Sequence, residues 1–252
     1  MRTVLLSRSI VLAAALFTAL ATACSAAAPA PTAVAPKAAG AAVTPPPVER
    51  EHLERQVRAD FFAGLGGDEV AFARAMKVCD DVIAARPDDP EALVWRGAGR
   101  LFEAGMAYRA GDPAKGHAQW ERALAEMDRA VALAPDEIGV RIPRGAALLG
   151  TAPHLPDARM ARPLYERAAA DYEVTLRLQE PTLGKLSMHA REELLFGLAD
   201  VEAHLGEAAR ARVLFERLLR DCPDSNLVPY ARAWLSGAQP DARPPCTGCH
   251  SG

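Results

Sequence analysis

Apolar residues recur at helical spacing through most of the chain beyond residue 48. In the first stripe, Leu53, Val57 and Phe61 are four residues apart, which places them on one face of a helix. The glycine-rich segment 64–68 then interrupts the stripe and ends in an aspartate, a pattern typical of one helix ending and another beginning. Stripes and breaks alternate in this way toward the C-terminus. The pattern predicts an all-α protein built from paired helices.

The breaks themselves repeat along the chain. A proline followed by an acidic residue ends the stripe at Pro87, Pro135 and Pro223, and a degenerate copy stands at Pro181. These stops are roughly 45 residues apart, which leaves room for two helices in each unit. The spacing predicts an array of antiparallel helix hairpins over residues 48–237, with a final capping helix over residues 226–236.

Small and large apolar residues alternate on one helix face before three of these prolines. They are Ala75, Cys79 and Val82 in the first unit, Ala123, Met127 and Ala130 in the second, and Ala211, Phe215 and Leu218 in the last. This order resembles the second helix of tetratricopeptide repeats (TPR), and Gly97 and Gly145 resemble the glycine at which the two helices of such a repeat cross. The resemblance implies a TPR-like α-solenoid whose concave face binds other proteins or peptide segments.

The units are longer than the ~34 residues of an ordinary tetratricopeptide repeat. We therefore expect longer helices or loops, with the excess at residues 105–111 and 150–157. Pro143 stands in the expected first helix of the third unit and predicts a late helix start or a kink. Arg141 and Arg144 beside it could grip a carboxylate or phosphate, but we favour a solvated helix face.

Composition narrows the function classes. Half of the residues are hydrophobic but only 6% are aromatic, because much of the apolar share is alanine, the best helix former. Lys and Arg total 29 against 32 Asp and Glu, so no basic excess supports nucleic-acid binding. The chain also has no glycine-rich phosphate loop and no H-E-x-x-H or G-x-S-x-G motif. We expect neither an enzyme nor a nucleic-acid-binding protein.

The first residues are typical of an export signal. Arg2 and Arg8 precede a short apolar run over residues 10–23, which predicts a signal peptide over residues 1–23. The sequence before Cys24 resembles the lipobox of bacterial lipoproteins, which implies lipidation of Cys24; an ordinary cleavage site is the alternative. The alanine- and proline-rich residues 24–47 predict a tether. We expect an exported, periplasm-facing lipoprotein that touches the membrane only through the lipid, with the outer membrane as one destination and the identity of the membrane left open.

The tail over residues 238–252 contains the sharpest chemical motif. Cys246, Cys249 and His250 form C-x-x-C-H, the attachment sequence of c-type haem. In this order the two thiols add to the haem vinyl groups and the adjacent histidine becomes an axial ligand of the iron. The export signal favours this interpretation, because c-type haem is attached outside the cytoplasm. The motif therefore predicts covalent haem c.

Three other interpretations of the tail remain open. No cytochrome c domain surrounds the motif, and the two cysteines could instead form a disulfide or a redox-active dithiol. They could also bind a metal with His250, although one motif supplies only three donors. The tail could finally dock onto a partner without using its thiols. If haem is bound, Met188 and His189 are candidates by residue type for the sixth ligand.

Together these features predict a cell-envelope scaffold that binds other proteins and carries one haem. It would be accessory to electron transfer or to assembly of a redox complex. The rival is a redox-inert adaptor lipoprotein with a tail disulfide or metal site, and a peptidoglycan or transporter accessory lipoprotein is a third hypothesis. Cys79 and Cys222 are expected to be buried and inert.

Overall fold

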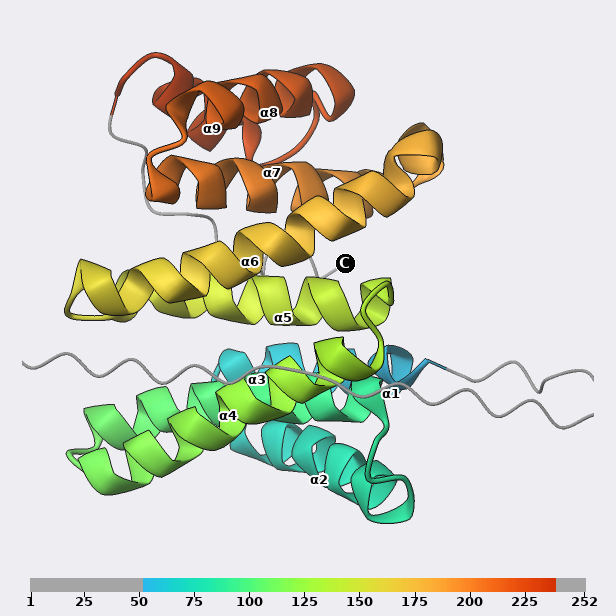
Figure 1. Cartoon of the computed structure of the whole chain (residues 1–252), viewed down its shortest axis with the longest axis vertical. Coiled ribbons are helices and arrows are strands. Elements are labelled where there is room, and N and C mark those ends of the chain that lie inside the picture. The colour runs from blue at the N-terminus through green and yellow to red at the C-terminus, as the bar shows by residue number, and fades with distance from the viewer. Residues whose placement is uncertain (1–51, 239–252) are drawn as a thin grey trace, which may run out of the picture. The chain divides into compact units, whose positions relative to one another are not determined.

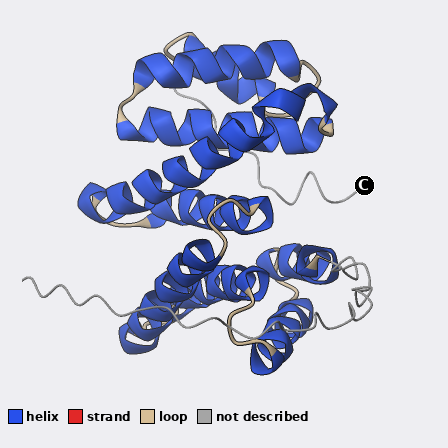
Figure 2. Cartoon of the chain, turned by 45° about the vertical axis from the view of Figure 1, so that its right-hand side comes forward, coloured by secondary structure: helices blue, strands red, loops and turns tan. Residues whose placement is uncertain are grey.

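A computed structural model describes residues 52–238 of the chain. The expected signal peptide, the tether and the C-x-x-C-H motif lie outside these residues. The described part contains helices and loops and no strand (Figure 2), which confirms the all-α prediction. The helices are α1 (Leu53–Leu65), α2 (Glu69–Ala85), α3 (Pro90–Arg109), α4 (Pro113–Leu133), α5 (Ile138–Thr151), α6 (Ala158–Gln179), α7 (Met188–Leu205), α8 (Ala208–Asp221) and α9 (Val228–Leu235), with short 3₁₀ turns at Ala152–His154 and Glu180–Lys185.

Successive helices pair as hairpins, α1 with α2, α3 with α4, α5 with α6, and α7 with α8 (Figure 1). The first helices of neighbouring hairpins also contact one another, α1 with α3, α3 with α5, and α5 with α7. Helix α9 packs on α8 and closes the end of the array, as the sequence predicts. The Tyr230 hydroxyl of α9 donates to Asp200 Oδ1 of α7 at 2.9 Å.

The helix starts follow from the local chemistry of the breaks. Asp89 caps α3, because its carboxylate accepts the backbone N–H of Ala92 at 3.0 Å, and Pro90 occupies the first helical position. Asp112 and Pro113 repeat this arrangement at α4. At the other end of a hairpin, Gly206 ends α7 with a φ of 88°, a conformation that glycine adopts without strain.

Glycines let the two helices of a hairpin cross closely. A Cβ on Gly97 would lie 2.6 Å from Cγ of Met127, and one on Gly145 would lie 3.2 Å from the ring of Tyr172. The glycine crossings expected from the sequence therefore exist. The predicted small and large positions on α2, α4 and α8 are buried, Val82 only in part. In the third hairpin the corresponding small and large buried positions are Ala168, Tyr172 and Thr175. The sequence pattern did not predict these three.

The extra length of the units lies mostly in the helices. Gly105 is inside α3, and α3 and α4 have 20 and 21 residues. Residues 150–157 contain both helix and loop. Gly150 and Thr151 end α5, and a 3₁₀ turn over Ala152–His154 follows. Pro143 does not delay α5, which begins at Ile138, because the side chain of Glu137 accepts the Gly139 N–H and caps the helix.

The prediction that Arg141 and Arg144 lie on a solvated helix face is wrong. Neither forms a solvated helix face, because both donate to Asp171 of α6, whose side chain is 0% exposed. Arg144 binds both carboxylate oxygens, at 2.7 and 2.8 Å, and reaches Asp128 of α4 at 2.9 Å. The two arginines do grip a carboxylate, and it belongs to the protein itself.

The same ion triad occurs one unit earlier. Arg96 of α3 donates to both oxygens of Glu126 on α4, at 3.1 and 2.8 Å, and to Asp80 of α2 at 2.9 Å. In both triads the arginine precedes the crossing glycine. The first carboxylate precedes the large packing residue of its own hairpin, Met127 or Tyr172. The triads therefore join three consecutive helices in equivalent ways, which is independent support for the repeat.

Candidate functional site

The residues predicted to carry chemistry, Cys24, Cys246, Cys249 and His250, all lie outside the described residues. The structure therefore bears on function through the surfaces that the helical body offers. Across residues 52–238, no three His, Cys, Asp or Glu side chains come together as a metal site would require. No helix in that range combines the length and apolar character needed to cross a bilayer.

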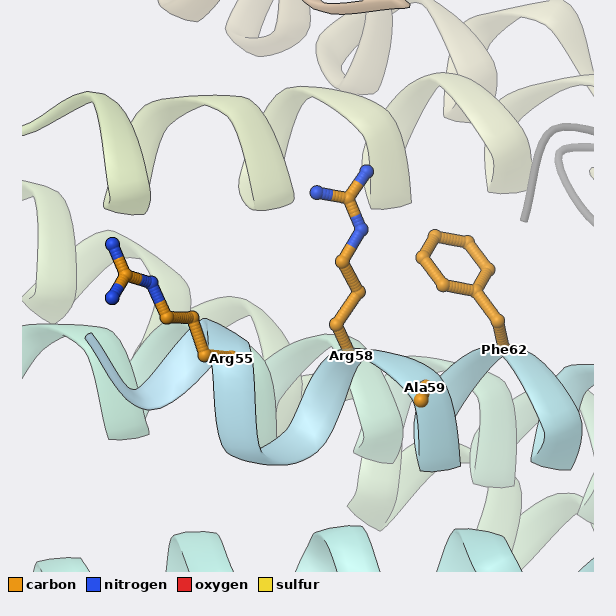
Figure 3. A pocket seen from close by; sticks show the side chains of 4 residues that line it. All are labelled: Arg55, Arg58, Ala59 and Phe62. Carbon is orange, nitrogen blue, oxygen red and sulfur yellow. The ribbon is translucent and has the colours of Figure 1, made fainter. Parts of the chain in front are cut away.

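A surface hollow of about 330 Å³ lies on α1. Its lining residues in the described chain are Arg55, Arg58, Ala59 and Phe62, which are three or four residues apart and so share one helix face. Figure 3 shows the two guanidinium groups and the Phe62 ring extending to the same side of α1. The hollow therefore combines two cationic side chains with one aromatic ring, and Arg58 is the cation that lies beside the ring. We call these four residues the α1 hollow.

Arg58 is held in place from three directions. Its guanidinium donates to Glu54 one turn earlier, lies 5.7 Å from the centre of the Phe62 ring, and approaches His189 Nε2 of α7 at 3.0 Å. Arg55 differs, because no carboxylate within residues 52–238 forms an ion pair with it and its side chain is exposed. The positive charge of Arg55 is therefore uncompensated among the described residues.

The first turn of α7 faces Arg58. His189 Nε2 lies 3.0 Å from the Arg58 guanidinium and 3.6 Å from Glu193 Oε2, and its Nδ1 lies 3.5 Å from Glu192 Oε1. Met188 is half exposed beside it. Glu192 is buried. Of the two candidate iron ligands, His189 lies against the α1 hollow, and its Nε2 is engaged by Arg58.

The start of α1 is fixed to α3 by one carboxylate. Glu91 accepts the backbone N–H of Leu53 at 2.7 Å and lies 2.6 Å from His52 Nδ1. This hydrogen bond, together with the charge of Glu91, raises the pKa of His52 above its ordinary value. The contact satisfies one of the free N–H groups at the helix start and ties the first residue of α1 to α3.

The two cysteines of the body are buried, as the sequence predicts. Cys79 and Cys222 are both free and buried. Burial raises the pKa of Cys79 to about 12, so its thiolate is scarce at neutral pH. Burial also raises the pKa of Cys222, so in both thiols burial disfavours the thiolate.

Comparisons with models of protein families, with curated proteins and with solved structures gave no match to this chain.

Proposed function

We propose that this chain is an exported helical-repeat scaffold that binds other envelope proteins or peptide segments and carries one c-type haem on its tail. The supporting observation is the array of hairpins with glycine crossings and repeated ion triads, because the first helices of successive hairpins contact one another in a row. Repeat arrays of this kind act by presenting an extended surface to a partner. The TPR-like class is part of this proposal and rests on the residue pattern.

Haem is the second part of the proposal. Cys246 and Cys249 would hold it through thioether bonds, and His250 would be the axial ligand of the iron. When bound, haem supplies one-electron transfer. A scaffold with one such group would serve electron transfer between envelope proteins or the assembly of a redox complex. Cys24 would anchor the chain through a lipid, with residues 25–47 as the spacer.

The test of the haem is a reduced pyridine haemochrome spectrum of protein purified from cells that attach c-type haem. We expect a c-type α band and an intact mass increased by one haem. The double substitution Cys246→Ser/Cys249→Ser should abolish both signals. The matched control, Cys79→Ala, removes a buried thiol outside the motif and should leave them unchanged.

The opposite result would identify the redox-inert adaptor. Wild-type protein without the α band, and with Cys246 and Cys249 joined as a disulfide by mass spectrometry, would overturn the haem assignment. Bound metal ion in place of haem, found by elemental analysis, would overturn it as well.

The scaffold role is tested separately by cross-linking in cells. A photoreactive amino acid at Ala59, in the α1 hollow, should give discrete adducts with partner proteins. The same amino acid at Val213, an exposed position on α8, is the control and should not give those adducts. Equal adduct patterns at the two positions would count against binding at this face.

A further inference from the structure

The two ends of the row of first helices meet. Helices α1, α3, α5 and α7 contact one another in that order, yet the Arg58 guanidinium of α1 lies 3.0 Å from His189 Nε2 of α7. In a straight row, three interhelical steps of 8–10 Å would put α1 and α7 about 24–30 Å apart. That separation exceeds the combined reach of one arginine and one histidine side chain. The row therefore curves until its first and last helices come within side-chain contact.

The contact between α1 and α7 joins a cation to an acidic helix start. Figure 3 shows the Arg58 side chain extending away from α1. On the α7 side, His189 lies 3.5 Å from Glu192 Oε1 and 3.6 Å from Glu193 Oε2, so two carboxylates belong to the first turns that receive Arg58. Glu54 pairs with the same guanidinium from within α1 and orients it. Charge thus favours the approach of α1 to α7.

The first helices between these ends expose almost no side chains. The only exposed residue of α5 is Gly150, and exposure along α3 begins at Met106 in its last turn. In α7 every residue from Leu194 to Glu202 is buried. Because successive helix residues point about 100° apart, a buried run of this length leaves no side of the helix open. Among the first helices, only α1 offers exposed side chains along its whole length.

We propose that the contact of Arg58 with the first turn of α7 is a clasp that holds the array closed, and that a partner segment reaches α3, α5 and α7 only when the clasp parts. This inference rests on the proposed scaffold function and adds its regulation. A partner that binds the open array better than the closed one shifts the population toward the open array. Small rotations at successive hairpin crossings are sufficient to change the curvature of the row.

Hydrogen exchange of Arg58→Gln tests the clasp. We expect a loss of protection in α5 and in residues 194–202, far along the chain from the substitution, together with a larger radius of gyration by small-angle X-ray scattering. The matched control is Arg55→Gln on the same helix, which removes an exposed arginine that forms no ion pair within residues 52–238. It should match the wild type in both measurements. Far-ultraviolet circular dichroism verifies that both variants remain helical.

A second variant approaches the clasp from α7. His189→Ala should open the array as Arg58→Gln does. If both residues belong to one clasp, the double variant should be no more open than either single variant, because effects of residues in contact are not additive. Additive losses of protection would mean two separate contacts and would overturn the clasp.

The remaining outcomes separate the clasp from the scaffold function. Equal exchange and equal radius of gyration in the wild type, Arg58→Gln and Arg55→Gln would overturn the clasp alone. Faster exchange confined to α1 would overturn it as well, because Arg58 would then steady only its own helix. Loss of protection in α5 and residues 194–202 would establish the clasp. The absence of partner adducts at Ala59, in the wild type and in the open Arg58→Gln variant, would instead count against the scaffold function.

Discussion

The two middle hairpins contain the same ion triad in different environments. In the α3/α4 hairpin the central pair is Arg96 and Glu126, whose side chains are 15% and 14% exposed. In the α5/α6 hairpin the equivalent pair is Arg144 and Asp171, at 8% and 0%. The same ion-pair geometry is therefore more exposed to water in the α3/α4 hairpin than in the α5/α6 hairpin.

A second arginine at each carboxylate increases the difference in exposure between the two hairpins. Arg100 joins Arg96 at Glu126 at 2.8 Å, with a side chain 21% exposed, while Arg141 joins Arg144 at Asp171 at 2.8 Å. Both carboxylates therefore face two guanidinium groups. Burying charge is costly unless every partner is present, so losing the carboxylate is far more damaging in the dry hairpin. The comparison teaches that local water access, more than the number of contacts, sets the energetic weight of a repeated motif.

Asp171→Asn should give the largest effect. Two guanidinium groups would face a neutral amide in a buried site, and removing one partner of a buried pair costs about 3–5 kcal/mol. We expect the midpoint of thermal unfolding, followed by far-ultraviolet circular dichroism, to fall by roughly 10 °C. A fall no larger than that of an exposed substitution such as Glu166→Gln on the same helix would contradict the buried-pair interpretation.

Glu126→Gln should cost less. Arg96 keeps its bond to Asp80, and both arginines can turn toward water, so the loss is limited to about 1–2 kcal/mol. Urea unfolding of the two variants side by side measures the difference between the hairpins. Equal free-energy losses for Glu126→Gln and Asp171→Asn would show that the difference in burial has no energetic weight.

The outer carboxylates of the two triads provide a sharper test of the same idea. Asp80 and Asp128 are 57% and 45% exposed, so each contributes at the level of a surface ion pair. Asp80→Asn and Asp128→Asn should each cost under about 1 kcal/mol and should agree with each other. A large loss for Asp128→Asn alone would mean that the third hairpin depends on its whole network and not on Asp171.

The smallest effect concerns pH and the α3/α4 hairpin. Burial raises the pKa of Glu103 above its ordinary value, and the Gln119 amide donates to its Oε2 at 2.8 Å. The folded state therefore binds this proton more tightly than the unfolded state, so its contribution to stability falls as pH rises from the ordinary value of 4.5 through the raised pKa.

Replacing Glu103 by Gln removes this dependence and keeps an oxygen for Gln119. The free energy of unfolding of Glu103→Gln, relative to the wild type, should increase between about pH 4 and about pH 7. The exposed Glu216→Gln serves as the control and should show no such trend. An unchanged difference for Glu103→Gln across that range would rule out the raised pKa.

Some of the unforeseen contacts did have a signal in the sequence. Arg96-Gly97 and Arg144-Gly145 are visible as a repeated pair, and an acidic residue stands directly before Met127 and Tyr172. A search for charged residues at fixed offsets from the packing positions would have paired them. The burial of Asp171 has no such signal, because it depends on how closely α5 and α6 approach around Tyr172.

The α1 hollow was not foreseen at all. Arg55, Arg58 and Phe62 share a helix face in the sequence, but an amphipathic helix shows many such faces. What distinguishes this face is the approach of His189, which is 131 residues away from Arg58 along the chain. Arg58 and His189 meet because of how several successive hairpins pack on one another, and no local sequence pattern predicts that packing.

The sequence by itself determined the all-α class, the hairpin ends and the positions where helices cross. Proline, aspartate caps and glycine act within a few residues, so their effects can be read along the chain. The Cys24 and Cys246–His250 motifs are local in the same way. Only the tertiary structure decided which charges are buried, as at Asp171, and which distant side chains meet, as at Arg58 and His189. Those outcomes depend on crossing angles that accumulate from hairpin to hairpin, because each helix is positioned by the packing of its predecessor.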